Sequence, residues 1–312
     1  MNPALSVVFF TVLAGLGQGL AVSLALGVLA GLLAPSGAFL GWGLAAAIAL
    51  LVAGLVASFL HLGRPERAWR AAAMWRTSWL SREVIVLPAF IGLLVLWWLA
   101  RRAGDWPAAL SAWLALATIA LALLLWLCTA MIYACIRFIQ EWAHPLTVFN
   151  YTLIGLASGL VLACSLAAAL GEGRLLAALG PFALAATLAA GAVRLASFER
   201  NARLRPASTL QSATGIRARK LTQLAMGMSA GSFNTREFFH GVAAASVRHI
   251  RLTAMLCAFV LPALLMAWGL LAASPLPWIA AVGVQLPGLL TERWVFFAQA
   301  RHPQNLYYQR VA

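Results

Sequence analysis

Long apolar stretches separated by short polar connections make up most of the chain. A helix needs about 20 consecutive apolar residues to cross the hydrocarbon core of a bilayer. The pattern predicts eight transmembrane helices, at about 4–33, 38–61, 84–100, 108–136, 149–170, 175–197, 252–272 and 276–297. Because the apolar residues run without the two-residue alternation of barrel strands, we expect an all-α bundle of eight helices in a single membrane domain.

The composition excludes a soluble globular protein. Of the 312 residues, 63% are hydrophobic and only 10% are charged, and the mean hydropathy is +0.90. Soluble domains carry about 25% charged residues. The sequence therefore predicts a polytopic membrane protein.

Basic residues are concentrated in the connections on one side of the predicted bundle. With eight spans, 19 of the 22 Lys and Arg residues fall at the termini and in the second, fourth and sixth connections, and the other three are Arg101, Arg102 and Arg174. The positive-inside rule places the basic side, and hence both termini, in the cytoplasm. The net charge of +14 lies in loops held at the membrane surface, so we expect anionic lipid or an acidic protein as partner and no nucleic acid.

The connection at 198–251 is the longest polar segment of the chain. It mixes Ser, Thr, Gly and Gln with basic and apolar residues, which makes it less charged and more apolar than a disordered tether. Two interpretations stay open. The segment is either a solvated loop with an interfacial helix or a docking platform for a hydrophilic subunit.

The residues that bind redox cofactors in proteins do not form a ligand pattern in this sequence. All five His residues fall at span ends or in connections, where no two of them face each other across the bundle as haem ligands do. The four Cys residues are scattered, without a Cys-x-x-Cys pair. We therefore expect no haem, iron–sulfur cluster or metal in this chain.

One cluster of polar residues lies at the expected cytoplasmic edge, in the stretch "SFLHLGRPERAW" and the following "SWLSREV". His61 ends the second span just before Gly63 and Pro65 break the helix, and Arg82 and Glu83 begin the third span. An imidazole at that depth can hydrogen-bond a quinone carbonyl and exchange a proton near neutral pH. The cluster thus predicts a quinone site.

The same residues also have simpler explanations. Arg64 and its basic neighbours fit a topology signal or lipid-headgroup contacts, and His61 alone fits an ordinary interfacial histidine. Glu83 is costly at the start of a span unless it is paired, and Arg82 or Arg64 is its expected structural partner. Gln18 is the one clear polar residue deep in a span, where it either bonds a neighbouring helix or lines a cavity.

Several motifs resemble the membrane-anchor subunits of bacterial molybdenum enzymes of the dimethyl sulfoxide reductase family. The stretches "LHLGRPERAW" and "SWLSREV" resemble that family's quinol-site region, and "FFTVLAGLGQGLA" resembles its first helix. The stretches "IYACIRFIQEW", "MGMSAGSFNTREFFHG" and "ERWVFFAQARHPQNLYYQ" resemble the branch found in cytoplasmic sulfite:quinone oxidoreductases (sulfite dehydrogenases). The resemblance extends over all eight predicted spans.

The resemblance implies a three-subunit complex in the bacterial cytoplasmic (inner) membrane. A catalytic subunit with a bis-pterin molybdenum cofactor would pass electrons through a subunit with four iron–sulfur clusters to this haem-free anchor, which would exchange them with ubiquinone or menaquinone. His61 matches the family's quinol-site histidine. We expect Arg64 and Arg82 to support the quinone electrostatically and Glu83 to relay protons, with Gln18 as a further candidate. The long 198–251 connection and the C-terminal tail favour the sulfite branch.

Other functions stay open at this point. The protein could instead anchor a dimethyl sulfoxide or related oxyanion reductase that oxidises quinol. A secondary transporter would place polar residues and broken helices near the membrane midplane in two matching halves, and we find no convincing repeat. A purely structural anchor would need only the basic face and the apolar spans.

Overall fold

The computed structural model describes residues 1–34, 37–60, 62–102, 107–206, 208–225, 233–272 and 274–307. Over these residues the regular structure is helical, without strands. The predicted all-α fold is therefore confirmed for the part of the chain that is described.

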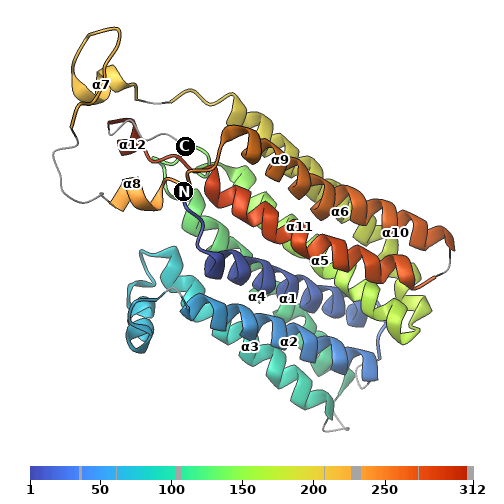
Figure 1. Ribbon diagram of the computed structural model, residues 1–312. Coiled ribbons are helices and arrows are strands. Elements are labelled where there is room, and N and C mark those ends of the chain that lie inside the picture. Colours follow the sequence, from blue (N-terminus) through green and yellow to red (C-terminus); the bar gives the residue numbers. More distant parts are fainter. Residues whose placement is uncertain are drawn as a thin grey trace.

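The long helices of the described residues lie lengthwise beside one another, and they form eight units (Figure 1). One of them is built from two α-helices joined through the π-helical turn η2. The units are α1 (Leu5–Leu29), α2 (Ala38–Phe59), α3 (Trp79–Arg102), α4 (Ala108–Ala134), α5 (Pro145–Leu170), α6 (Gly173–Ala202), the unit of α9 (Ala244–Met255), η2 (Leu256–Val260) and α10 (Leu261–Ala272), and α11 (Leu276–Ala298).

Seven of these units are long and apolar enough to cross a membrane, and α11 is not among them. The polytopic membrane architecture is thereby confirmed. The helix α11 corresponds to the predicted eighth span. It has 23 residues and packs along α5 and α10 within the same bundle. The count of eight spans stays a prediction.

The observed helices extend beyond several of the predicted spans. The third begins at Trp79 instead of 84, the sixth runs to Ala202 instead of 197, and the seventh begins at Ala244 instead of 252. Hydropathy marks the residues that suit hydrocarbon, whereas a helix continues through polar residues until its backbone is capped or broken. The extension of α3 places Glu83 inside a helix.

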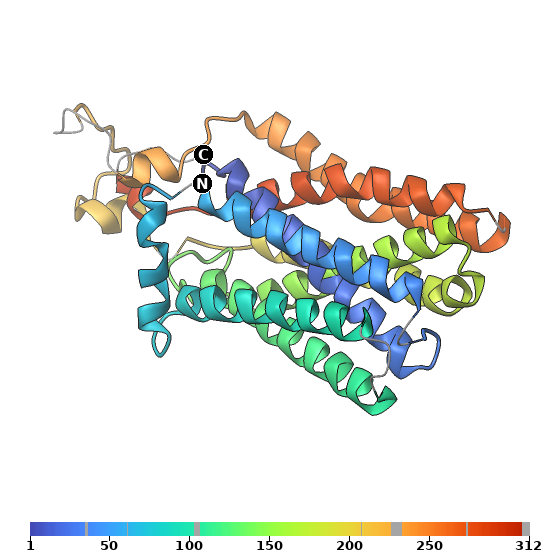
Figure 2. The same ribbon diagram turned by 90° about the horizontal axis from the view of Figure 1, so that it is seen from below.

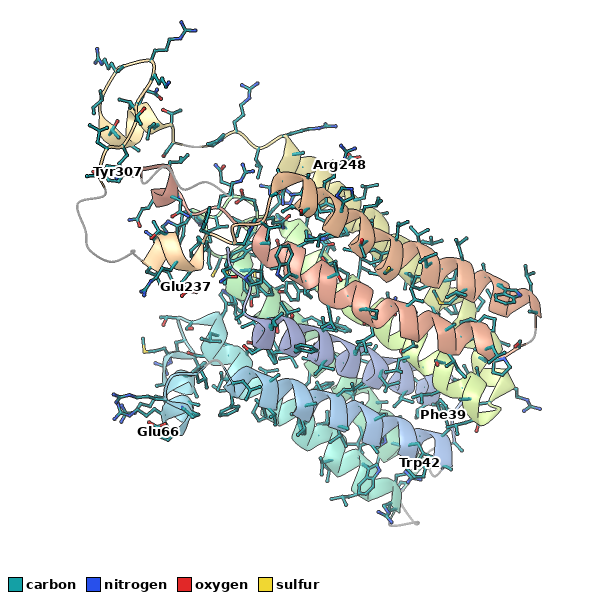
Figure 3. The ribbon with its side chains drawn as sticks, viewed as in Figure 1. Phe39, Trp42, Glu66, Glu237, Arg248 and Tyr307 are labelled. Atoms are coloured by element: carbon teal, nitrogen blue, oxygen red, sulfur yellow. The ribbon has the colours of Figure 1, made fainter. Side chains whose placement is uncertain are left out.

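The two ends of the bundle differ. One end, at the left of Figure 1, carries the N-terminus, the connection at 135–144, and the short helices η1 (Pro65–Met74), α7 (Leu210–Thr214), α8 (Phe233–Glu237) and α12 (Gln304–Tyr307). We call it the polar end. Figure 2 shows η1 lying crosswise to the long helices at this end. At the opposite end the helices are joined by short connections, and Phe39 and Trp42 mark the start of α2 there (Figure 3).

Helix α1 lies at the centre and packs against α2, α4, α5 and α11. Its backbone meets that of α5 at glycines, where a Cβ atom added at Gly159 would overlap the backbone of Gly19. One turn earlier on the same face of α5, a Cβ atom at Gly155 would lie 2.5 Å from the indole nitrogen of Trp126 on α4. Small residues at such crossings let helices approach closely within a membrane.

Candidate functional site

Of the residues predicted to bind quinone, Arg64, Arg82 and Glu83 lie at the polar end, and their surroundings differ. His61 lies outside the described residues. Arg64 is exposed and directly precedes η1. Figure 3 shows Glu66 on η1, apart from the bundle. This stretch presents its polar side chains to the outside, where they are accessible to lipid headgroups or to another subunit.

Arg82 stabilises the connection between η1 and α3 by hydrogen bonds to its backbone. Its Nε donates to the carbonyl of Trp75 at 2.9 Å, and its Nη2 donates to the carbonyl of Arg76 at 2.8 Å. Its guanidinium lies 4.2 Å from the centre of the Trp79 ring. Arg82 therefore closes the turn before α3.

Glu83 is buried, with 5% of its surface exposed. Its carboxylate accepts a hydrogen bond from the hydroxyl of Thr129 on α4. Arg82 or Arg64 was the expected structural partner, and the structure corrects this expectation, because none of the ion pairs among the described residues includes Glu83. One turn into α3 the side chain faces α4, whereas Arg82 points back toward the connection.

Gln18 lines a small cavity enclosed by α1, α4, α5 and α11. The space that the centres of water molecules could occupy is about 30 Å³. Gln18 is 2% exposed, and its Oε1 is buried without a hydrogen-bond partner, as is the indole nitrogen of Trp126. Thr129 also lines the cavity. Of the two interpretations left open, the cavity lining is the one observed. Thr129 thus joins the surroundings of Gln18 to those of Glu83.

A buried ion cluster adjoins the same cavity. Glu292 on α11 is fully buried, and its carboxylate pairs with Arg194 of α6 at 2.6 Å and with the neighbouring Arg293. Both arginine residues are 3% exposed or less. Arg293 lines the cavity and lies 4.5 Å from the centre of the Tyr151 ring. The three ions carry a formal net charge of +1 inside the bundle.

The prediction from sequence missed this cluster. Arg194 and Arg293 were counted among the basic residues of the cytoplasmic connections, and Gln18 was taken as the one clear deep polar residue. The structure corrects both interpretations, because Arg194 and Arg293 are buried within α6 and α11 and pair there with Glu292. The available signal was a Glu-Arg pair followed by the apolar run "WVFFA", which is unusual for a surface connection.

A second, smaller cavity leads from the ion cluster toward the polar end. Arg194 lines it together with Asn150 and Ser197, whose side chains are joined by a 2.7 Å hydrogen bond. His144, just before α5, lies at its outer part. Burial and the nearby charge of Arg200 hold the pKa of His144 below its usual value of 6.5.

A larger pocket of about 150 Å³ opens at the polar end between the 138–141 connection, residues 201–208 and residues 300–306. His302 packs against Phe138 and Phe238, with ring centres 5.2 and 5.0 Å away. Burial holds the pKa of His302 below 6.5. The segment that follows α11 therefore packs against the predicted 198–251 connection. Among the described residues, no group of three or more His, Cys, Asp and Glu side chains is arranged to hold a metal ion.

Comparisons with known proteins agree with this architecture. The family model described as DMSO reductase anchor subunit (DmsC) matches residues 1–214. The protein is 49% identical to the C subunit of the sulfite dehydrogenase of Allochromatium vinosum, over the full length of both. It is also 28% identical to one chain of the anaerobic dimethyl sulfoxide reductase of Haemophilus influenzae, over 52% of this chain and 58% of that one. A further relative is the anaerobic dimethyl sulfoxide reductase protein YnfH of Escherichia coli, 33% identical over 44% of this chain and 46% of that one.

The resemblance inferred from the motifs is confirmed by these matches. The apolar helices, the family match and the full-length relative point to the same conclusion. The chain belongs to the DMSO reductase anchor subunit family, whose members are membrane anchors of molybdoenzyme complexes.

Proposed function

We propose that this chain is the membrane-anchor and quinone-reactive subunit of a three-subunit molybdenum and iron–sulfur oxidoreductase. It exchanges electrons between the iron–sulfur subunit and the quinone pool of the bacterial inner membrane, in the course of sulfite oxidation. The observation that carries the proposal is the buried Glu83, which bonds Thr129 directly after the polar stretch 61–82. The full-length likeness to a sulfite dehydrogenase subunit supports the choice of substrate.

The residues present fit a quinone. The head group needs hydrogen-bonding and proton-exchanging side chains, and its isoprenoid tail needs apolar surface. Glu83 supplies a buried carboxyl group at the polar end, and Leu60, Trp75 and Leu80 are large apolar side chains that are at least half exposed nearby in the chain. A bound quinone would supply two-electron, two-proton redox chemistry.

In this proposal each residue has one task. His61 hydrogen-bonds the head group, and Arg64 supports it electrostatically. Arg82 holds the turn between η1 and α3 through its bonds to Trp75 and Arg76. Glu83 exchanges protons. Gln18 lies deeper and acts through the cavity that it shares with Thr129.

The polar end is the proposed docking face for the iron–sulfur subunit, which carries four clusters in this proposal. Between 198 and 251 it bears a set of basic residues that face away from the bundle core or lie at its edge: Arg200, Arg203, Arg205, Arg217, Arg219, Lys220, Arg236, Arg248 and Arg251. His302 packs on Phe238, so the segment after α11 is part of the same proposed face. In this arrangement α11 is the eighth span, and the polar end with both termini lies in the cytoplasm.

An anchor of a dimethyl sulfoxide reductase is the second candidate. The likeness to two proteins of such reductases over about half of this chain favours it. The two candidates share the quinone site and differ in the direction of electron flow and in the partner's substrate. Turnover of the purified complex with sulfite plus quinone, against dimethyl sulfoxide plus quinol, separates them.

The quinone site is tested by His61→Ala and Glu83→Gln in the purified complex. We expect both to lose quinone-coupled turnover while dye-coupled turnover of the catalytic subunit is retained. Glu66→Gln is the matched control, because Glu66 is exposed and its pairing with Arg67 at 3.9 Å lies at the surface. Unchanged quinone turnover in both variants would place the site elsewhere.

A further inference from the structure

The cavity between α1, α4, α5 and α11 lies inside the bundle, and several polar side chains reach its mostly apolar wall. Several buried atoms of residues that line it have no hydrogen-bond partner in the protein, among them Gln18 Oε1 and Trp126 Nε1. Buried polar groups in native proteins are nearly always bonded to protein or to ordered water. An acceptor and a donor that both lack a hydrogen-bond partner beside one cavity therefore indicate that a polar molecule is bound in it.

The volume of the cavity limits which polar molecule can be bound there. Its 30 Å³ exceeds the roughly 10–15 Å³ that one water molecule needs. About two water molecules fit, and a quinone ring does not. The lining offers both donors and acceptors, since Trp126 and Arg293 donate, Gln18 accepts, and Ser158 and Tyr151 can do either.

We propose that this cavity holds ordered water and that Glu83 exchanges its proton with that water through the hydroxyl of Thr129. The cavity is then the inner part of a proton path between the quinone site and the polar end. The inference rests on the proposed role of Glu83 in quinone chemistry. Beyond that role, it assigns the cavity as a separate binding site for water.

Thr129 is placed to transmit the proton. Its hydroxyl donates to Glu83 Oε1, while its oxygen keeps lone pairs for a donor in the cavity that it lines. During uptake, the Thr129 hydroxyl proton moves to the Glu83 carboxylate while the cavity water gives a proton to the Thr129 oxygen and is itself reprotonated from the polar end. The hydroxyl is restored and one proton has been transferred. Release from Glu83 follows the same steps in reverse.

The ion cluster connects the two cavities and balances the charge of the proposed path. Arg293 lines the water cavity, Glu292 links it to Arg194, and Arg194 lines the smaller cavity of Asn150 and Ser197 that leads toward His144. Arginine stays protonated in proteins, so these residues hold water by hydrogen bonds without taking up the proton themselves. The net charge of +1 on the cluster compensates the carboxylate of Glu83 when its proton has left.

The test uses the full purified complex with Thr129→Val, Thr129→Ser and the matched control Thr118→Val. Thr118 is fully buried on the same helix, away from the cavity, and its hydroxyl bonds the carbonyl of Leu114. Two quantities are measured. One is quinone-coupled turnover relative to dye-coupled turnover. The other is the rate at which the carboxyl C=O infrared band of Glu83, identified by its loss in Glu83→Gln, shifts after transfer to D₂O.

We expect Thr129→Val to slow both the band shift and quinone-coupled turnover about tenfold or more, with dye turnover retained. Thr129→Ser should restore both to within about twofold, because it keeps the hydroxyl. Thr118→Val should match the unmodified protein. Gln18→Leu is a second variant that removes a cavity acceptor and leaves the Thr129–Glu83 bond intact, and it should slow the band shift as well.

A band shift at the unmodified rate in both Thr129→Val and Gln18→Leu would overturn the inference, and Glu83 would then exchange directly with the surface. So would the absence of any Glu83-dependent band that responds to D₂O. The proposed quinone function fails on a different result, namely full quinone turnover in Glu83→Gln. The two failures are therefore distinguishable.

Discussion

Glu83 on α3 and Glu292 on α11 are both buried inside the bundle. A buried carboxyl group needs partners that compensate the loss of water, and the two regions supply different partners. Glu292 is held between two guanidinium groups. Glu83 is held by one hydroxyl group, and it takes no part in the ion pairs among the described residues.

The different partners of Glu292 and Glu83 determine whether each carboxyl group can change its protonation state. A buried carboxylate between two arginines is fixed in its charged form, because its protonation would leave two buried cations without a counter-ion. A buried carboxyl group beside a hydroxyl can be charged or neutral, since the hydroxyl both donates and accepts. Glu292 therefore joins α6 to α11 structurally, whereas the surroundings of Glu83 are compatible with the proton exchange that we propose for it.

The largest effect on stability is expected from Glu292→Gln. Removal of one partner of a buried ion pair costs about 3–5 kcal/mol, because the remaining charges stay buried and unpaired. Thermal unfolding of the purified complex in detergent, followed by circular dichroism, measures the loss. Glu66→Gln, at an exposed ion pair, should change stability by less than about 0.5 kcal/mol. Equal melting temperatures for the two variants would refute the structural role of the cluster.

A smaller loss is expected from Gly159→Ala, at the crossing of α1 and α5. The added Cβ would collide with the backbone of Gly19, and overpacking of this kind costs about 1–3 kcal/mol. Gly92→Ala is the matched control, because Gly92 lies inside α3 and a Cβ atom there meets nothing within 4 Å. The same melting experiment should show a loss for Gly159→Ala and none for Gly92→Ala.

Glu83→Gln should change stability by less than about 1 kcal/mol, since the neutral amide oxygen still accepts the Thr129 hydrogen bond. This variant sharpens the contrast most directly, because the same carboxyl-to-amide change at Glu292 should be strongly destabilising. Melting temperatures of the two variants, measured side by side, provide the comparison. A loss at Glu83 as large as that at Glu292 would show that both carboxyl groups are structural.

The smallest effect concerns the pH dependence of the polar end. The pKa of His302 is lowered by burial, so its neutral form is favoured in the folded state and the unfolded state binds the proton more readily. The stabilisation from this group is therefore present above pH 6.5 and is lost as the pH falls through its lowered pKa. Protection factors of the amides at residues 298–307, with the intrinsic exchange rate at each pH divided out, should fall as the pH is lowered from about 7.5 to about 5.5. His302→Gln should show less of this change.

The sequence alone was sufficient for the helical membrane architecture, because continuous apolar stretches have few alternatives in a bilayer. It also led to Glu83 and Gln18 as notable polar residues. The partners of Glu83 and Gln18 could not be read from it. Thr129 is one of many hydroxyl residues in apolar helices, and its pairing with Glu83 depends on how α3 and α4 are rotated against each other.

The ion cluster was missed for a related reason. Arginines near the end of an apolar stretch normally extend to the headgroup region, so Arg194 and Arg293 fit a topology signal. Their burial depends on Glu292, which comes from a helix about 100 residues further along the chain than Arg194. Pairings between distant helices are set by packing, which hydropathy does not encode.

The glycine crossing of α1 and α5 has a consequence for biosynthesis. Gly19 cannot reach its final contact until Gly159 has been made, roughly 140 residues later, which at about 5–20 residues per second takes on the order of 7–28 seconds. During that interval the first helix lies in the membrane with its glycine face against lipid or against the insertion machinery. The central helix of the bundle is thus the first to be made and among the last to be enclosed, and a premature partner for that face would trap the nascent chain.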